Sequence, residues 1–332
     1  MTITDKRETQ EAPLTTHGSS FANTAFTGLT GFAASLILIL LAAVATFLIT
    51  EAWPALTEGG TFLASKVDWI RPEQGESLVQ IIGYLVFGTV LISAIALLIA
   101  TPLSVGIALF ISHYAPRRLA AGLGYLIDLL AAIPSVVYGL WGAIVLIPVL
   151  QPFYQWLGHY FGWIPLFTPD PLTGVVSPTG RVALSAAIVL AIMIVPIITA
   201  ITREVFLQTP KLHEEAALAM GATRWEMIRM AVFPFGRSGI IGATMLGLGR
   251  ALGETMAVYM ILSVGLSYSF NILQSGEHNT IASYIAGQFP ESNSYGVSAL
   301  IAMGLALFII TLLVNILARW IVSRRSEFSG AN

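Results

Sequence analysis

Two charged residues, Arg250 and Glu254, stand in an otherwise apolar, glycine-rich run that reads MLGLGRALGETMAVYMIL over residues 245–262. A spacing of four places both side chains on one face of a helix, within reach of each other. Arginine also carries a planar fork of donors that suits phosphate oxygens. The pair could therefore be a structural ion pair that holds two helices in register, or the arginine could give a passing anion a transient site.

Three other polar residues could line the same path. Asp128 lies two residues before the stretch LAAIPSVVYG, which contains Ser135 and Tyr138 as possible hydrogen-bond donors. Asp128 could equally be a solvated or helix-capping carboxylate, and we favour core packing for Tyr138. No pair of histidines or carboxylates has the spacing of metal ligands, so we expect no metal site.

The surroundings of these residues indicate a membrane. Of 332 residues, 56% are hydrophobic and 10% are charged, whereas an ordinary soluble domain carries about 25% charged residues. Four stretches without Asp, Glu, Lys or Arg each exceed the ~20 residues that a helix needs to cross a bilayer. They are residues 12–50, 77–116, 129–169 and 292–318. We therefore expect an all-α integral membrane protein.

Six transmembrane helices are predicted from the apolar segments. They cover about 30–50, 80–112, 120–149, 182–202, 239–266 and 295–318. Cytoplasmic loops collect Lys and Arg, and twelve such residues fall in the two tails and in the second and fourth loops. Only three, Lys66, Arg71 and Arg181, fall on the other side. Both termini are therefore expected in the cytoplasm.

Several kinds of chemistry are excluded by the residues present. A phosphate-binding P-loop needs Gly-Lys followed by Ser or Thr, but Lys6, Lys66 and Lys211 follow Asp, Ser and Pro. No strand precedes Gly249 and Gly253, so they form no dinucleotide fingerprint and instead predict a face where another helix can approach. The absence of cysteine excludes disulfides and thiolate chemistry, and the net charge of −2 gives no reason to expect nucleic acid.

The longest polar connection, residues 202–239, predicts a helix–turn–helix on the cytoplasmic face. KLHEEAALAM is strongly helix-forming, Gly221 and Thr223 interrupt it, and RWEMIRMAV resumes a helix before Pro234. Its charges could simply be solvated, as in an amphipathic hairpin at the membrane interface, or the hairpin could bind a partner.

A spacing pattern in this loop favours the second alternative, that the hairpin binds a partner. It consists of a Glu-Ala-Ala triplet, a glycine after three residues and a proline further on, namely Glu215, Ala216, Ala217, Gly221 and Pro234. The pattern resembles the EAA loop of binding-protein-dependent ABC importer permeases, although Ala231 and Phe233 replace that family's Ile and Leu. The resemblance implies a coupling helix that docks into a cleft on a separate ATPase subunit. Small alanines allow close approach, and glycine permits a sharp turn.

Four further stretches resemble the PstC-type permeases of the phosphate-specific ABC importer. They are TPLSVGIALFISHYAP (101–116), LAAIPSVVYGLWG (130–142), GLGRALGETMAVYMIL (247–262) and NTIASYIAG (279–287). The resemblance implies a type I ABC importer permease (MetI-like) core with six transmembrane helices, and import of inorganic phosphate. The PstA-type permease of the same importer has a similar core. An arginine and a glutamate are implicated in phosphate passage in this family, and Arg250 and Glu254 match them, so we favour passage over a purely structural pair.

The same resemblance implies an assembly. The partners would be a PstA-type second permease, PstB-type ATPase subunits that bind ATP and magnesium, and a PstS-type extracytoplasmic phosphate-binding protein. This chain would hold no cofactor and would be a transport subunit, not an enzyme, in the lipid of the bacterial plasma (inner) membrane. The expected segments are a disordered cytoplasmic tail (1–29), a first transmembrane helix with an external loop (30–77), a permease domain (78–320) with a coupling loop (203–238), and a cytoplasmic tail (321–332).

Other functions stay open at this point. A permease for another oxyanion, molybdate or sulfate, would share the EAA loop. A secondary anion transporter would also suit six helices with one buried ion pair, but it would transport without a partner and leaves the EAA loop unexplained. An intramembrane hydrolase needs a nucleophile paired with a base inside the bilayer, and no histidine lies near the middle of a predicted span.

Overall fold

The structure is a computed structural model of the chain and describes residues 20–57, 66–67, 69–70, 77–171 and 173–323. Over these residues the chain is helical, with loops and one isolated β-bridge between Val182 and Ser275. The predicted all-α class is therefore confirmed.

Two compact units divide the chain, Met1–Thr50 and Glu51–Asn332. The first unit holds most of helix α1 (Ser20–Thr57), whose side chains from residue 23 to residue 50 are exposed or half-buried and mainly apolar. Because α1 begins at Ser20, the expected tail of 1–29 is wrong for residues 20–29, and residues 1–19 lie outside the described part of the chain.

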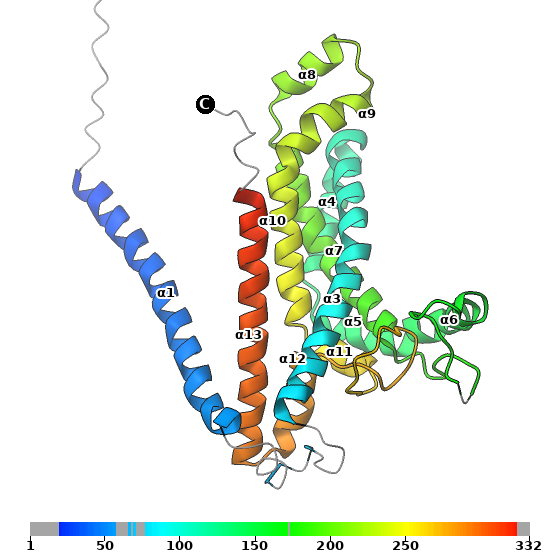
Figure 1. The fold of residues 1–332 in the computed structure, drawn as a ribbon. Helices are drawn as coiled ribbons and strands as arrows, with labels where there is room; N and C mark the ends of the chain where they lie inside the picture. Colours follow the sequence, from blue (N-terminus) through cyan, green and yellow to red (C-terminus); the bar gives the residue numbers. More distant parts are fainter. Residues whose placement is uncertain (1–19, 58–65, 68, 71–76, 172, 324–332) are drawn as a thin grey trace, which may run out of the picture. The chain divides into compact units, whose positions relative to one another are not determined.

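Helix α7 (Ala183–Leu207) forms the centre of the second unit. It packs against α3 (Leu78–Leu109) and α10 (Phe233–Leu252), and Figure 1 shows these helices running beside α13 (Ser294–Ser323). Small residues let helix backbones approach closely in membranes. On α7 they are buried in the largest apolar cluster, as Ala183, Ala186, Ala187 and Ala191.

Six helical stretches of the described chain are long and apolar enough to cross a membrane, which confirms the expected number. They are Asn23–Thr57, Leu78–Tyr114, Ser135–Phe161, Ala183–Leu207, Arg224–Leu252 and Ser294–Trp320. The third and fifth differ from the predicted bounds, and in both cases a helix break explains the difference.

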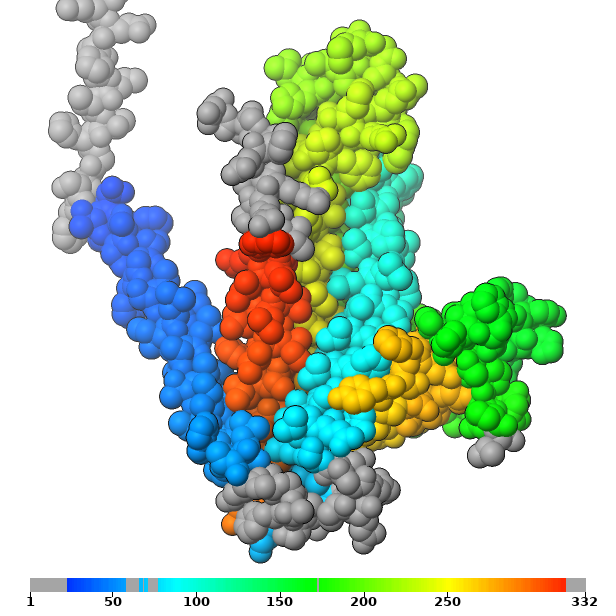
Figure 2. All heavy atoms as spheres, viewed as in Figure 1, coloured from blue at the N-terminus to red at the C-terminus, as the bar shows by residue number. Residues whose placement is uncertain are grey.

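The third predicted span, 120–149, is not one helix. Helix α4 (Arg117–Ala131) ends before Pro134, and α5 (Ser135–Trp141), a π-helical turn (Gly142–Leu146) and α6 (Ile147–Phe161) follow. Proline has no N–H to donate and pushes the preceding residue out of the helical region, so the break falls at Ile133–Pro134. After the break, α5 and α6 leave the direction of the other long helices of this unit and form a lobe, seen in green in Figure 2.

The fifth predicted span, 239–266, is also broken. Its helix begins earlier, in the polar loop, and α10 ends at Leu252; after Gly253–Thr255 comes the short helix α11 (Met256–Ile261), followed by a non-helical segment up to α12 (Ile281–Gln288). Arg181 satisfies the carbonyl end of α11 by donating to the oxygens of Met260, Ile261 and Leu262 at 3.1–3.4 Å. Irregular backbone at membrane depth needs such internal partners.

The predicted helix–turn–helix is present between α7 and α10. It consists of α8 (Lys211–Ala219), a turn at Gly221, and α9 (Arg224–Met227), which continues through a π-helical turn (Ile228–Val232) into α10. Thr223 and Glu226 form a capping box at the start of α9, each accepting a hydrogen bond from the other's backbone N–H. The connection between the long helices is therefore 208–232, shorter than the expected coupling loop of 203–238.

Candidate functional site

Glu254 does not sit on the same helix as Arg250. Arg250 lies in the last turn of α10, whereas Glu254 follows the helix end at Gly253. Residue Glu254 is 8% exposed, and its Oε1 accepts a hydrogen bond of 3.1 Å from the backbone N–H of Ala257, at the start of α11. Glu254 thus caps the next helix, as an acidic side chain does near a helix N-terminus.

Arg250 makes no ion pair with Glu254 or with any other described residue. Its Nε is buried without a hydrogen-bond partner. The expected i, i+4 ion pair is wrong, because it requires helical backbone through residue 254 and α10 ends two residues earlier. A guanidinium without a carboxylate neighbour keeps its donors for another acceptor.

A cavity of about 1120 Å³ lies beside the Arg250 side chain, between α10, α13 and one residue of α7. Its polar lining residues are Ser238, Arg250, Asn315 and Arg319, and the rest of its wall is apolar or glycine. Gly242 and Gly249 contribute backbone only, and a Cβ atom added at either would meet no atom within 4 Å. The helix approach expected at Gly249 is therefore absent within the described chain, and this face of α10 borders open space instead.

Tyr138 is close to Arg250, and the two side chains interact electrostatically. The Tyr138 hydroxyl donates a hydrogen bond of 3.0 Å to the carbonyl of Leu130, across the break between α4 and α5. Tyr138 is buried, so it combines the favoured packing role with a position beside the arginine. Ser135 is half-buried at the start of α5 and does not line the cavity.

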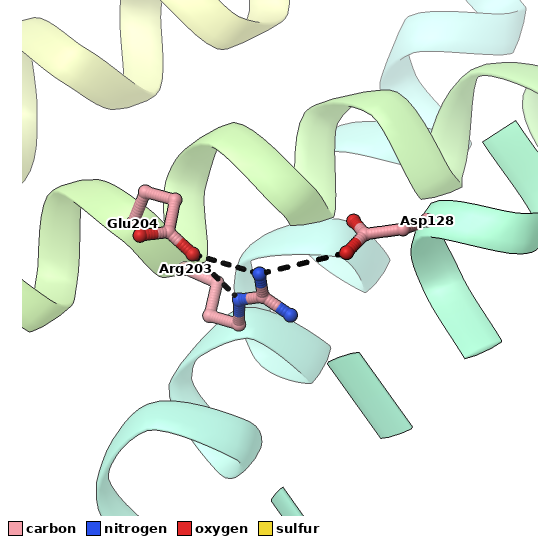
Figure 3. A network of polar contacts seen from close by, with 3 residues as sticks. All are labelled: Asp128, Arg203 and Glu204. Atoms are coloured by element: carbon pink, nitrogen blue, oxygen red, sulfur yellow. Dashed lines mark hydrogen bonds and ion pairs between the residues drawn. The ribbon is translucent and has the colours of Figure 1, made fainter. Parts of the chain in front are cut away.

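Asp128 belongs to a different group of residues. Its carboxylate lies 4.0 Å from Arg203 Nη2, and the same nitrogen contacts Glu204 Oε1 at 2.7 Å (Figure 3). This cluster ties α4 to α7, and the Arg203 guanidinium lies over Gly124, where a Cβ would clash with it. Asp128 does not line the cavity beside Arg250.

The EAA-like residues occupy the hairpin of α8 and α9. Ala217 is buried with Phe206 and Ile228, whereas Glu215 and Ala216 are exposed. The backbone of Gly221 has φ +86°, a left-handed conformation that favours glycine, and Pro234 is the second residue of α10. The large exposed apolar side chains of α8, α9 and the turn between them are Leu212, Leu218, Met220 and Trp225.

Some contacts near the hairpin and the cavity could not be predicted from the sequence. His113 Nε2 lies 3.6 Å from Glu214 Oε1 and joins the end of the second span to α8. Asn315 and Arg319 meet Ser238 around one cavity, although more than seventy positions separate them in the chain. The spacing of four between Asn315 and Arg319 could have suggested a shared helix face, but nothing in the sequence indicates which helix that face borders.

Comparison with protein families gives a match over most of the chain. Residues 100–327 match the family described as binding-protein-dependent transport system inner membrane component. The phosphate transport system permease protein PstC 2 of Mycobacterium tuberculosis is 45% identical over 291 residues, which cover 86% of this chain and 87% of that protein. The permease protein PstC of Mesorhizobium japonicum is 41% identical over 313 residues, which cover 92% of this chain and 91% of the relative.

Solved structures share the fold at low sequence identity. An inward-facing structure of the MetNI methionine ABC transporter gives a TM-score of 0.53 at 15% identity, over 74% of this chain and 96% of the matched chain. A bacterial ABC transporter involved in import of the acidic polysaccharide alginate gives 0.52 at 17% identity, over 91% and 99% of the two chains. These similarities confirm the expected MetI-like core.

Proposed function

The chain belongs to the family of binding-protein-dependent transport system inner membrane components, and on that premise we propose that it is the permease subunit of an ATP-driven importer of inorganic phosphate. It is a multi-pass membrane protein and a transport subunit rather than an enzyme. Its relatives at 45% and 41% identity are phosphate transport permeases, and the match covers most of each chain. The phosphate ion would cross the membrane along a path that this chain forms together with a second permease.

The observation that carries the proposal at residue level is the unpaired Arg250. A cation at bilayer depth is costly, by about 2.5–17 kcal/mol according to the estimate used. Within the described residues no carboxylate pairs with the Arg250 guanidinium, and the Glu254 carboxylate is hydrogen-bonded to the backbone at the start of α11. Arg250 is one of the residues that line a cavity. A planar donor fork facing such a space suits a phosphate oxyanion, which would supply the missing negative charge during its passage.

Coupling to ATP hydrolysis is proposed for the hairpin of α8 and α9. The exposed residues around Glu215 and Ala216 would dock on a PstB-type ATPase, which would bind ATP and magnesium. The buried Ala217 fixes α8 on the end of the bundle, so that a displacement of the ATPase would be transmitted to α7 and α10. A PstA-type permease and a PstS-type phosphate-binding protein would complete the importer.

The proposed location is the bacterial inner membrane, with both termini and the hairpin in the cytoplasm. This orientation is supported by the distribution of twelve Lys and Arg residues against three across the predicted loops.

Uptake of radiolabelled phosphate by cells lacking other phosphate transporters tests the role of Arg250. We expect Arg250→Gln to abolish uptake while the importer still assembles, and Arg250→Lys to be intermediate, because an ammonium lacks the planar fork. Arg237→Gln is the matched control, since Arg237 is exposed near the start of the same helix and does not line the cavity. Normal uptake by assembled Arg250→Gln would contradict the passage role.

The variant Arg250→Gln with Glu254→Gln separates passage from a structural pair. A structural pair predicts that removing both charges restores what one change loses. We expect no recovery, because Glu254 caps α11 and does not neutralise Arg250. Competition by molybdate or sulfate in the same uptake measurement identifies the oxyanion: inhibition by phosphate alone supports the proposed substrate, and stronger inhibition by another oxyanion contradicts it.

A further inference from the structure

The cavity beside Arg250 is also lined by a second arginine, Arg319, to which the proposed function gives no role. We propose that Arg319, with Asn315 and Ser238, forms a second site for the phosphate ion at the cytoplasmic end of this cavity, which the ion occupies after leaving Arg250. This inference rests on the proposed function and adds an exit site to the same path.

The position of Arg319 follows from the antiparallel course of α10 and α13. The first helix starts and the second helix ends at the end of the bundle where the hairpin of α8 and α9 lies (Figure 1). Along α10 the cavity lining extends from Ser238 to Arg250, and twelve residues of α-helix rise about 18 Å. Arg319 and Ser238 therefore mark the hairpin end of the cavity, and Arg250 marks its deeper end.

The polar groups at the hairpin end are free to bind an anion. The side chains of Ser238, Asn315 and Arg319 make no hydrogen bond or ion pair within the part of the chain that the structure describes. Asn315 and Arg319 are four positions apart on α13 and project toward one face. Together the three residues offer a guanidinium fork, an amide and a hydroxyl, which are groups that donate to phosphate oxygens.

Arg250 and Arg319 differ in solvent exposure, and a path for an ion requires sites of different strength. Conduction needs sites that bind strongly enough to attract an ion and weakly enough to release it. Arg250 is half-buried with its Nε out of contact with water, whereas Arg319 is exposed. Because water screens a charge, Arg319 would bind phosphate more weakly than Arg250 and would draw the ion toward the cytoplasm without retaining it.

Uptake by the whole importer in proteoliposomes tests the site. The probe is radiolabelled inorganic phosphate, with the binding protein outside and ATP available to the ATPase. We expect Arg319→Gln to lower the initial uptake rate about tenfold, which corresponds to a loss of about 1.4 kcal/mol. Arg319→Lys should be intermediate, and Arg237→Gln should stay close to wild type, because Arg237 carries the same charge at the same end of α10 but lies off the cavity.

A second pair of variants tests the cavity without changing any charge. Gly242→Leu would place a side chain in the cavity, since a Cβ there meets no atom within 4 Å. Gly106→Leu on α3 is the matched control, because that glycine is equally open and does not line the cavity. We expect Gly242→Leu to assemble and to lose uptake, and Gly106→Leu to retain it.

Three results would overturn the exit site. The first is an uptake rate for assembled Arg319→Gln equal to that of Arg237→Gln. The second is wild-type uptake by Gly242→Leu. The third is an effect of Arg319→Gln only in liposomes that contain anionic phospholipid, with none in neutral phosphatidylcholine, because this would identify the ligand as a lipid headgroup. Loss of uptake in Arg250→Gln but not in Arg319→Gln would leave the proposed function intact and reject only the exit site.

Discussion

Arg250 and Glu254 have different interactions although they are only four positions apart in the sequence. The Glu254 carboxylate accepts a hydrogen bond from the Ala257 N–H, whereas Arg250 lines the cavity and interacts electrostatically with Tyr138. A buried charge needs either a partner or an exchangeable ligand. Glu254 has a hydrogen-bond partner within its own chain. We propose that the transported ion is the exchangeable ligand of Arg250.

Substitutions of Glu254 should follow its capping role. We expect Glu254→Gln to retain uptake, because the amide oxygen can still accept from Ala257. We expect Glu254→Ala to lower the free energy of unfolding by about 0.5–2 kcal/mol, the cost of removing a helix cap. Thermal unfolding of the purified importer, alongside phosphate uptake, measures both effects. Equal loss of uptake in the two variants would show that the charge of Glu254, and not its acceptor, is required.

The capping box of α9 makes the hairpin sensitive to acid. The backbone N–H and hydroxyl of Thr223 both donate to Glu226 Oε2 at 2.8 Å, which lowers the pKa of that carboxyl from its ordinary value of 4.5. A lowered pKa means that the stabilisation is complete above pH 4.5 and is lost as pH falls through the lower folded-state pKa.

Hydrogen exchange of the hairpin, corrected for the intrinsic pH dependence, should therefore be constant at neutral pH and should rise as the pH falls below the ordinary carboxyl pKa of 4.5 and through the lowered pKa of Glu226. The variant Glu226→Gln cannot titrate at this position and should remove the acid-induced step. An unchanged step in that variant would assign the acid sensitivity to another group.

At the scale of helices, the site depends on two breaks in otherwise apolar segments. Pro134 ends the helical course of α4, and the Tyr138 hydroxyl bridges that break to the Leu130 carbonyl. The end of α10 at Leu252 separates Arg250 from Glu254, while Arg181 satisfies the carbonyls at the far end of α11. A side chain thus bridges the first break, and Arg181, from a distant part of the chain, satisfies the end of the short helix that follows the second break.

The turn between α8 and α9 has room for a larger side chain at Gly221 but requires a residue that adopts the left-handed backbone conformation. Gly221 has φ +86°, and a Cβ there would meet nothing within 4 Å. The left-handed conformation costs an ordinary L-residue roughly 1–2 kcal/mol, and asparagine adopts it more readily than other residues. We expect Gly221→Val to weaken co-purification with the ATPase and Gly221→Asn to retain it. Normal binding and substrate-stimulated ATP hydrolysis by Gly221→Val would show that the turn geometry does not control docking.

At the scale of the molecule, function requires a fixed orientation in the bilayer. The proposed arrangement places the hairpin end of α10 and α13, with the cavity opening near Arg319, toward the cytoplasm. The loop between α6 and α7 would then face outside. The chain has no cysteine, so a single introduced thiol reports the side on which it lies.

Labelling with an impermeant maleimide in intact cells should modify Thr173→Cys and leave Met220→Cys unmodified. Thr173 is exposed in the loop after α6, and Met220 is 80% exposed in the hairpin. Ser177 would be a poor choice in the same loop, because it is 1% exposed and its hydroxyl is hydrogen-bonded to Ser275. Permeabilised cells provide the control for Met220→Cys, and its modification in intact cells would reverse the proposed orientation.

The amino-acid sequence by itself determined the class of protein, the number of spans and the residues of interest. Charge-free stretches longer than a bilayer predict helices directly, because the bilayer selects for apolar length alone. Two helix-forming stretches interrupted by Gly221 and Thr223 predicted the hairpin. Arg250 was identified because a charge in an apolar run is costly wherever the helix packs.

Only the tertiary structure decided how these residues are combined. The sequence predicted a pair between Arg250 and Glu254, but α10 ends between them, and the broken backbone depends on Arg181, about eighty positions away from α11. It also offered Asp128 either for the path or as a solvated or capping carboxylate, whereas in the structure this carboxylate lies 4.0 Å from Arg203 Nη2 and does not line the cavity. The cavity that joins Ser238 to Arg319 is lined mainly by two helices far apart in sequence. Spacing along one helix follows from local geometry, but contacts between helices depend on how the whole set of side chains packs, and a local pattern does not contain that information.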